Sequence, residues 1–319
     1  MKVFVQIPCL NEAETLHLVL ESIPKKISGV DSLEILIIDD GSTDDTIKIA
    51  KQHGVKHFVR HRRNMGLARS FHDGVDYALK HGADIVVNTD GDNQYPQGRI
   101  PDLIKPIIDG KADITIADRQ TQTIAHFSPF KKVMQRFGSW VVNQAAGTDL
   151  PDAASGFRAY SRKSLLRLNI VTQFSYTMET IIQAGNKRLA IASVPIETNP
   201  KTRESRLFKN IWQHMLKSGQ AILRSYVMFK PHVIFATLGV VMLLLSAIPF
   251  IRFIYIWAID GSAGHVQSLI FGSATLTGAL LCFTLLIISD LLRTNRVLAE
   301  DQLERIKEIQ YGFNKPNSN

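Results

Sequence analysis

The sequence has few of the features that mark secreted, disulfide-bonded or cysteine-ligated metal proteins. Its two cysteines, Cys9 and Cys282, lie far apart in different kinds of sequence, so neither a disulfide nor a cysteine metal site is indicated. The N-terminus runs directly into an apolar strand pattern at residues 3–7 and lacks the layout of a signal peptide. No internal repeat or low-complexity block is present. We therefore expect one large domain, or a domain with an appendage, whose main part stays on the cytoplasmic side.

Acidic residues are the scarcer of the two charge types. The formal net charge is +8 and the sequence pI is near 9.4. Such a chain favours anionic partners: nucleic acid, anionic lipid or phosphorylated substrates. The basic residues concentrate beside an apolar C-terminal region, which argues against nucleic acid. The histidines at positions 53, 57, 61, 72 and 81 have no spacing typical of metal ligands.

Hydrophobic patterning in the first half alternates between strands and helices. Strands are predicted at residues 3–7, 34–38, 57–59, 84–88 and 113–117, and helices at 11–23, 65–80 and 101–109. Asn11, with Glu14 three residues later, forms a capping-box pattern at the first helix. The alternation predicts an α/β fold with a mostly parallel sheet and helices on both faces. Ligands bind such sheets at the carboxyl ends of the strands, where the sequence places Pro8, Asp39, Asp40, Asp90 and Asp92.

Two carboxylates one residue apart follow the strand predicted at residues 84–88. Asp90 and Asp92, with Gly91 between them, can face the same hard cation, and the amide oxygen of Gln94 can add a ligand. Mg²⁺ and Mn²⁺ take oxygen ligands from carboxylates, water and substrate phosphates. The stretch therefore predicts a metal that holds a diphosphate, although Asp-Gly-Asp is also ordinary turn chemistry.

A second acidic stretch, Asp39-Asp40-Gly41-Ser42-Thr43-Asp44, follows the strand at residues 34–38. A carboxylate there can accept hydrogen bonds from a nucleobase edge or a ribose hydroxyl. The alternative is that Ser42 or Thr43 caps the next helix while the acids favour its N-terminus. Both can hold, because the cap would position the loop that carries Asp40.

The second half has a different character. Residues 201–230 hold seven Lys or Arg against one acid, with aromatic and aliphatic residues at roughly helical spacing. This pattern is typical of an amphipathic helix in a membrane interface, although a basic surface helix packed on the main domain would share it. Residues 233–251 and 266–289 carry no charge, and each is long enough to cross a hydrocarbon core of about 30 Å.

These two apolar stretches predict a transmembrane hairpin, with two buried helices of a soluble domain as the alternative. Basic residues flank the hairpin on both sides: Lys217, Arg224 and Lys230 before it, Arg293 and Arg296 after it. This bias places both flanks in the cytoplasm. We expect four parts: a main domain (1–200), a basic amphipathic juxtamembrane segment (201–231), two transmembrane helices (232–290) and a cytoplasmic C-terminal helix and tail (291–319).

Four motifs in order resemble glycosyltransferase family 2. They are Ile7-Pro8-Cys9-Leu10-Asn11-Glu12, Ile38-Asp39-Asp40-Gly41-Ser42-Thr43-Asp44, Arg63-Asn64-Met65-Gly66-Leu67-Ala68 and Asp90-Gly91-Asp92. Their order and spacing match that family's nucleotide-sugar-binding half, a fold of the GT-A type. The resemblance covers roughly residues 1–200.

Three further stretches are similar to dolichyl-phosphate mannose synthases and their bacterial polyprenyl-phosphate relatives. Residues 90–96 resemble the metal motif of that group, in which a His commonly stands where this chain has Tyr95. Residues 152–158 resemble its acceptor-loop motif. Residues 203–206 resemble its basic loop more loosely, because a Gly-x-Ser-Lys form is usual there. The basic segment and C-terminal hairpin also fit those enzymes.

The resemblance implies roles for individual residues. Pro8, Asn11, Glu12, Asp39 and Asp40 would line the nucleoside pocket; Asp90, Asp92 and Gln94 would hold Mg²⁺ or Mn²⁺, with Asp90 also beside the nucleotide-sugar; and Arg119, Arg158, Arg203 and Arg206 would grip the acceptor phosphate or the leaving diphosphate. An arginine fork suits phosphate because it can bind two oxygens at once. Each arginine could equally be a solvated surface charge. Asp92, Asp152 and Arg158 are the catalytic candidates.

The reaction implied by the resemblance is a metal-dependent, inverting transfer of one sugar. The donor would be a UDP-sugar or GDP-mannose, and the acceptor undecaprenyl or dolichyl phosphate at the cytoplasmic membrane face. A phosphate nucleophile hardly needs a strong base. If a base acts, Asp152 is the candidate, and Asp152 could equally orient Arg158 or its loop. A homo-oligomer through the hairpin and C-terminal helix is compatible with the resemblance.

Other classes fit the sequence less well. A nucleotidyltransferase would carry a glycine-rich basic loop after the first strand, whereas residues 8–12 are acidic and free of glycine. A processive polysaccharide synthase would show more spans and a Gln-x-x-Arg-Trp motif, which is absent. Transfer to another membrane lipid or glycan stays open, as does a non-enzymatic nucleotide-sugar-binding scaffold, although a scaffold would be expected to lose the metal acids.

Overall fold

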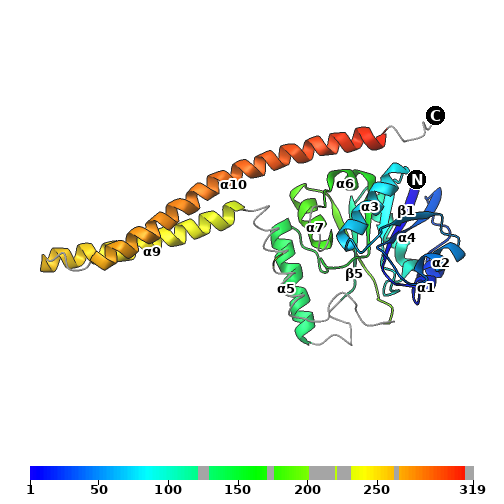
Figure 1. Cartoon of the computed structure of the whole chain (residues 1–319), viewed down its shortest axis with the longest axis horizontal. Coiled ribbons are helices and arrows are strands. Elements are labelled where there is room, and N and C mark those ends of the chain that lie inside the picture. The colour runs from blue at the N-terminus through cyan, green and yellow to red at the C-terminus, as the bar shows by residue number, and fades with distance from the viewer. Residues whose placement is uncertain (121–128, 171–175, 201–219, 221–230, 262–265, 313–319) are drawn as a thin grey trace. The chain divides into compact units, whose positions relative to one another are not determined.

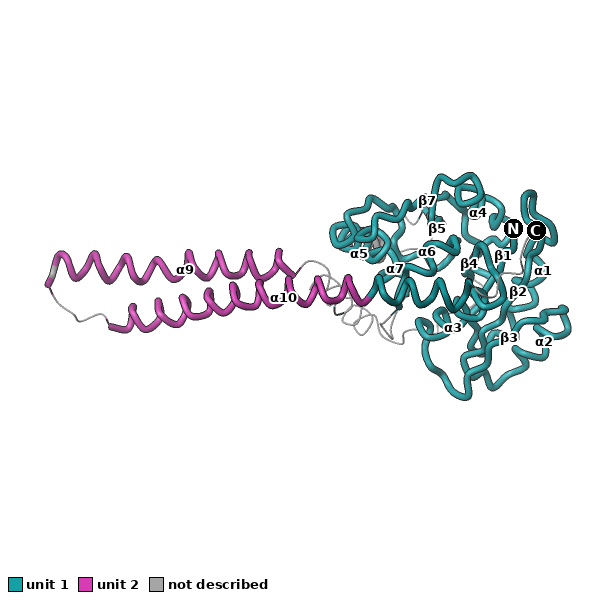
Figure 2. Tube along the Cα trace, turned by 90° about the horizontal axis from the view of Figure 1, so that it is seen from above, with its two compact units in different colours: residues 1–222, 300–319 teal, residues 223–299 magenta. Residues whose placement is uncertain are grey.

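The computed structural model describes residues 1–120, 129–170, 176–200, 220, 231–261 and 266–312. The chain divides into two compact units (Figure 2): residues 1–222 with 300–319, and residues 223–299. The first unit contains the sheet and the second contains two long helices. Apart from Gln220, the predicted basic segment lies outside the described residues, and Arg203 and Arg206 lie outside them with it.

The described residues of the first unit form a seven-stranded sheet with the order β3-β2-β1-β4-β6-β5-β7. The strands are β1 (Lys2–Cys9), β2 (Ser32–Asp39), β3 (His57–Arg60), β4 (Ile85–Asn88), β5 (Ile114–Asp118), β6 (Arg158–Ser161) and β7 (Ile191–Pro195). β1 runs parallel to β2 and β4, whereas β6 is antiparallel to both β4 and β5. The predicted mostly parallel sheet is confirmed, and the antiparallel β6 is an element that the sequence analysis missed.

Helices connect the strands and cover the sheet. They are α1 (Leu16–Ser22), α2 (Thr46–Gln52), α3 (Leu67–Lys80), the 3₁₀ turn η1 (Gln97–Arg99), α4 (Ile100–Ile108), α5 (Pro129–Ala146), α6 (Arg162–Arg167) and α7 (Tyr176–Asn186). Figure 1 shows helices such as α3, α4 and α7 around the sheet. Side chains alternate between the faces of β1. Its Val3, Val5 and Ile7 share one core with residues of α1 and α4, whereas Gln6 faces Gly74 of α3. The sheet is therefore covered on both faces.

The predicted capping box at the first helix is wrong. α1 begins at Leu16, and its N-cap residue, Thr15, makes no side-chain cap hydrogen bond. Asn11 lies in the left-handed region with φ 56°. Its side-chain oxygen accepts a hydrogen bond from the backbone N–H of Thr43, 2.8 Å away. Asn11 thus joins two loops across the sheet edge instead of starting a helix.

The second unit pairs α9 (Pro231–Asp260) with the first part of α10 (Val266–Gly312). Both helices are long and apolar enough to cross a membrane by length and composition. Small residues bring them close: Gly239 faces the ring of Phe283, and Gly278 faces Met242. The predicted connection from residue 252 is wrong, because α9 continues through Pro249 and Arg252 to Asp260. The predicted charged tail helix is the uninterrupted end of α10.

Candidate active site

The loops after β1 and β2 are bonded to each other at the carboxyl edge of the sheet. The backbone N–H of Asn11 donates to Ser42 Oγ (2.9 Å), and that of Glu12 donates to Thr46 Oγ1 (2.9 Å). The alternative role for Ser42 or Thr43 as a helix cap is wrong, because the N-cap position of α2 is Asp45. These bonds fix the predicted nucleoside residues Pro8, Asn11 and Glu12 against the acidic loop.

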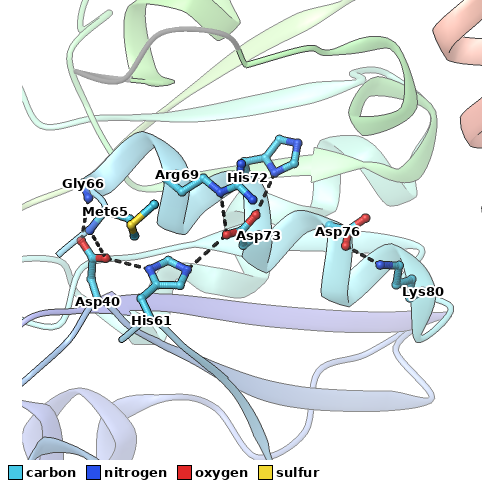
Figure 3. Close-up of polar contacts among 9 residues, drawn as sticks. All are labelled: Asp40, His61, Met65, Gly66, Arg69, His72, Asp73, Asp76 and Lys80. Carbon is cyan, nitrogen blue, oxygen red and sulfur yellow. Dashed lines mark hydrogen bonds and ion pairs between the residues drawn. The ribbon is translucent and has the colours of Figure 1, made fainter. Parts of the chain in front are cut away.

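Asp39 and Asp40 are neighbours in sequence with different partners. Asp39 is 2% exposed, and its Oδ1 accepts a hydrogen bond from the N–H of Ser42 (2.9 Å) inside its own loop. Asp40 is 5% exposed and accepts hydrogen bonds from the N–H groups of Met65 (2.7 Å) and Gly66 (2.9 Å), as Figure 3 shows. Asp39 therefore shapes its turn, and Asp40 joins the loop after β2 to the start of α3.

Gly41 makes this junction possible. Its φ is +83°, a conformation that L side chains rarely adopt. A Cβ at Gly41 would lie 2.8 Å from the carbonyl carbon of Arg63, so only glycine lets the two backbones approach. Gly41 of the acidic motif thus packs directly against the backbone of the Arg63-Asn64-Met65-Gly66 motif.

The predicted metal residues lie on the loop after β4. Gln94 donates from its amide nitrogen to Asp92 Oδ2 (2.9 Å) and from its backbone to Asp92 Oδ1 (3.1 Å). Thr15 Oγ1 donates to the carbonyl of Gly91 (2.8 Å), which holds the loop against the start of α1. Asp90, Asp92 and Gln94 are all partly exposed, so their oxygens can reach a ligand.

The donor set fits a hard cation that shares its ligands with a substrate. No group of three or more His, Cys, Asp or Glu with metal-binding geometry occurs in the part of the chain that the structure describes. Mg²⁺ typically uses only one or two carboxylates and fills its remaining positions with water and phosphate oxygens. Asp90 and Asp92 supply that number of carboxylates, so the pair suits a metal carried in with a diphosphate.

A buried tyrosine connects the metal loop to the predicted acceptor loop. Tyr95 Oη accepts a hydrogen bond from the N–H of Gly156 (3.0 Å), and its ring stacks on Phe157 with a centroid distance of 5.2 Å. Asn88 donates to the carbonyl of Gly156 (3.0 Å). Burial raises the pKa of Tyr95. Asn88 was not predicted as a site residue, and Tyr95 was predicted only as a departure from the usual His.

Asp152 pairs with Arg119 and not with Arg158. Arg119 donates from Nε to Asp152 Oδ2 (2.6 Å) and from a terminal nitrogen to Oδ1 (2.9 Å). Burial by itself would raise the pKa of Asp152, but the hydrogen bonds and charge of Arg119 lower it below its usual value. The carboxylate is thus held as an anion with both oxygens engaged, which suits orientation of the loop better than proton abstraction.

Arg158 lies at a different place from the one expected of a phosphate-binding residue. It is 0% exposed at the start of β6. Its guanidinium donates to the carbonyls of Ser155 (2.7 Å), Thr177 (2.8 Å) and Ala153 (3.0 Å) and to the hydroxyl of Thr180 (2.9 Å). In this geometry Arg158 holds the predicted acceptor loop together from inside. Both Arg119 and Arg158 were predicted to bind phosphate, and of the two only Arg119 is partly exposed.

The chain matches a known protein family over about half of its length. The family model described as "Glycosyl transferase family 2" matches residues 4–168, which is more than half of the chain. The chain belongs to glycosyl transferase family 2. The resemblance inferred from the four motifs is thereby confirmed.

Named relatives within the family act on polyprenyl phosphates. The chain is 26% identical to UDP-N-acetylglucosamine–dolichyl-phosphate N-acetylglucosaminyltransferase of Methanococcus voltae, over 61% of this chain and 85% of that one. It is 26% identical to undecaprenyl-phosphate mannosyltransferase of Micrococcus luteus (61% and 83%). It is 30% identical to dolichol-phosphate mannosyltransferase of Pyrococcus furiosus (67% and 62%).

Solved structures with the same fold include a family member of another kind. Glucosyl-3-phosphoglycerate synthase from Mycobacterium tuberculosis, in complex with Mn²⁺, UDP and glucosyl-3-phosphoglycerate, matches with a TM-score of 0.54 and 21% identity. The match covers 71% of this chain and 78% of that one. At this identity the likeness establishes the fold, which is of the GT-A type.

Proposed function

We propose that this glycosyltransferase moves a single sugar from a nucleotide-sugar to a polyprenyl phosphate at the cytoplasmic face of a membrane, with inversion at the anomeric carbon. The observation that carries the proposal is the meeting of three loops at one sheet edge. The Asp40 loop suits a nucleoside, the Asp90–Asp92 loop suits a metal diphosphate, and the loop closed by Tyr95 and Arg158 suits an acceptor. The relatives that act on dolichyl and undecaprenyl phosphates support the choice of acceptor.

In the proposed reaction an oxygen of the acceptor phosphate attacks the anomeric carbon, and the nucleoside diphosphate leaves from the opposite face. Asp90, Asp92 and Gln94 would hold Mg²⁺ or Mn²⁺, which neutralises charge on the leaving diphosphate. Within the described residues, the pairing of Arg119 with Asp152 uses Nε and one terminal nitrogen. The other terminal nitrogen of Arg119 can therefore bind a phosphate. Arg119 would then position the phosphate by its charge, and no general base is required.

The proposed membrane attachment rests on the second unit. Apolar side chains along α9 and α10 are largely exposed, among them Leu244 (65%), Ile251 (65%) and Ile270 (65%). Such a surface is expected to be covered by lipid. Arg293 and Arg296, which follow the second apolar stretch, support a cytoplasmic position for its end. Protease added to sealed inside-out vesicles should digest residues 1–200, and protease added to right-side-out vesicles should spare them.

The test of the proposed function is transfer of labelled sugar into lipid that partitions into organic solvent. Purified protein in detergent receives undecaprenyl or dolichyl phosphate, Mg²⁺ or Mn²⁺, and one of UDP-glucose, UDP-N-acetylglucosamine, UDP-galactose or GDP-mannose. We expect one donor to label the lipid and EDTA to abolish the labelling. Asp92→Asn should lose at least about 100-fold in rate, a loss on the order of a missing transition-state contact, whereas the exposed Asp102→Asn should not.

Two results would contradict the proposal in different ways. Nucleotide-sugar binding without lipid labelling would point to another acceptor. Absence of both nucleotide-sugar binding and lipid labelling would exclude the proposed enzymatic function and favour a membrane scaffold.

A further inference from the structure

A buried histidine occupies the nucleoside end of the site. His61 follows β3, and its backbone N–H donates to the carbonyl of Asp39 (2.9 Å). Its side chain is 9% exposed and lies between two carboxylates, as Figure 3 shows. Nδ1 is 2.7 Å from Asp40 Oδ1, and Nε2 is 3.2 Å from Asp73 Oδ2 on α3.

Asp73 is itself held as an anion. Arg69 Nε donates to Asp73 Oδ2 (2.8 Å), and His72 Nδ1 lies 3.0 Å from Asp73 Oδ1. Burial by itself would raise the pKa of Asp73, but the hydrogen bonds from His72 and Arg69 lower it overall. The imidazole of His61 thus has one ring nitrogen within hydrogen-bond distance of Asp40 and the other within hydrogen-bond distance of Asp73.

The consequence for Asp40 is an unequal pair of oxygens. Oδ1 accepts hydrogen bonds from His61 and from the N–H of Met65, and these fill both of its lone pairs. Oδ2 accepts only from the N–H of Gly66 among the described residues. Asp40 therefore offers a ligand one acceptor position, on Oδ2.

A single acceptor distinguishes between nucleobases. Uracil presents one N–H donor, N3–H, between two carbonyls. Guanine presents two adjacent donors, N1–H and the N2 amino group, which pair with both oxygens of a free carboxylate. Cytosine presents an unprotonated N3, which faces a carboxylate unfavourably. With Oδ1 filled, guanine would lose one of its two bonds and leave a donor unpaired.

We infer that His61, anchored by Asp73, is a specificity-determining residue that restricts Asp40 to one acceptor and makes the enzyme a user of UDP-sugars in preference to GDP-sugars. This inference rests on the proposed nucleotide-sugar function and narrows its donor class. His61 acts through Asp40 and is therefore a positioning residue.

The test is direct binding of UDP, GDP and CDP, each with Mn²⁺, to the full-length protein in detergent, measured by calorimetry. For the wild type we expect UDP to bind roughly 10- to 100-fold more tightly than GDP and CDP, the range that one missing hydrogen bond with an unpaired donor implies. GDP binding equal to or tighter than UDP binding would overturn the inference while leaving the proposed function intact. Failure to bind any of the three would overturn both.

Two variants of similar size separate positioning from packing. In His61→Asn, the introduced amide nitrogen can take the place of Nδ1 and keep the bond to Asp40. In His61→Gln, the introduced amide nitrogen takes the place of Nε2 and leaves Oδ1 of Asp40 with a vacant lone pair. We expect His61→Asn to keep the preference for UDP and His61→Gln to reduce the UDP-to-GDP affinity ratio by at least about fivefold.

Equal ratios in the two variants would show that His61 only fills space, and would overturn its assigned role. Asp73→Asn provides a second route if a His61 variant does not fold. It leaves the ring of His61 in place but weakens its anchor, so the UDP-to-GDP ratio should fall in the same direction. An unchanged UDP-to-GDP affinity ratio in Asp73→Asn would show that Asp73 does not anchor the ring of His61.

Discussion

Two buried tyrosine hydroxyls near the site differ in their partners. Tyr95 Oη accepts from the N–H of Gly156, whereas the hydroxyl of Tyr160 has no hydrogen-bond partner among the described residues. Tyr95→Phe leaves a buried N–H unpaired and should lower the free energy of unfolding by about 1–3 kcal/mol. Tyr160→Phe removes an unsatisfied hydroxyl and should be neutral or stabilising. Thermal melting of both variants in detergent tests the difference, and equal melting temperatures would contradict it.

The Arg119–Asp152 pair should make the difference in stability between the wild type and Asp152→Asn depend on pH. Asp152→Asn leaves the guanidinium of Arg119, whose side chain is 18% exposed, without its counter-charge, and we expect a loss below the roughly 3–5 kcal/mol that breaking a fully buried pair costs. The pKa of folded Asp152 lies below the unfolded value, so the pair contributes fully above that unfolded value and less as the pH falls through the folded pKa.

The measurement is melting of the wild type and Asp152→Asn between pH 3 and 8. We expect a constant difference above about pH 5 and a shrinking one below about pH 4, where the unfolded wild type takes up the proton at a higher pH than the folded protein does. The exposed pair of Arg99 and Asp102 provides the control, since Asp102→Asn should change stability by at most about 1 kcal/mol. A difference that grows toward acid would show that Asp152 is not the ionised partner.

The order of residues predicts which side chains gather at the sheet edge but not what each one contacts. Asp40 and Asp90 follow parallel strands directly, so their meeting at one edge could be predicted. The partners of Arg158 are carbonyls of residues 153, 155 and 177, which no side-chain pattern marks. The role of His61 was equally hidden, because its two carboxylates come from separate elements.

The strands of the first half could be predicted because a parallel sheet alternates buried apolar strands with helices along the sequence. Residues 34–38, 84–88 and 113–117 are all strands with boundaries close to those expected. β6 was missed because its four residues pair antiparallel between β4 and β5, a tertiary contact that its own sequence does not signal. Asn11 was misread because a cap pattern is local, and here the loop contact with Thr43 determined its conformation.

The packing of α5 on α7 gives a test at one glycine. A Cβ at Gly185 would lie 2.1 Å from the carbonyl oxygen of Ala146, and backbone at that distance cannot move aside cheaply. Gly185→Ala should therefore destabilise the protein by about 1–3 kcal/mol or more. Gly138 lies within α5 with nothing within 4 Å of its Cβ position. Gly138→Ala should be neutral or stabilising by up to about 1 kcal/mol through helix propensity.

Melting temperatures of Gly185→Ala and Gly138→Ala test whether the close contact at Gly185 causes the destabilisation. Destabilisation by both to the same extent would mean that the loss at Gly185 does not come from its close contact with Ala146. Tolerance of both would show that α7 does not approach α5 as closely as the structure has it.

The end of α10 joins the chain's C-terminal region back to the catalytic unit. Lys187 pairs with Glu300 (2.8 Å) and Arg167 with Glu304 (3.4 Å). Tyr311 donates to Asp76 on α3. The same helix begins as the second apolar stretch, at Val266. A single continuous helix thus carries both the proposed membrane span and a docking segment for the catalytic unit. The separate predictions of two transmembrane helices (232–290) and of a C-terminal helix and tail (291–319) did not contain this arrangement.

Lys307 lies at the centre of this docking segment. Its ammonium donates to the carbonyl of Leu168 (2.9 Å) and to Asn169 Oδ1 (2.6 Å). Burial, with the charge of Lys187, lowers the pKa of Lys307 to about 8. The undocked segment keeps a pKa near 10.4, so between about pH 8 and 10.4 the undocked state binds more protons than the docked one. Docking should therefore tighten as the pH rises through this window.

Hydrogen exchange at residues 300–312 in detergent measures that docking. Lys307→Met keeps the length of the side chain and removes its charge and donors, so the pH dependence of protection between about 8 and 10.4 should disappear. Protection at about pH 10.4, where wild-type Lys307 docks uncharged with its hydrogen bonds to Leu168 and Asn169, should fall in the variant. Arg305→Met, at an exposed position two residues away, should leave both unchanged. Protection that is the same in the wild type and in Lys307→Met at every pH would mean that the two salt bridges and Tyr311 hold the helix without Lys307. In that case the proton linked to docking belongs to another group.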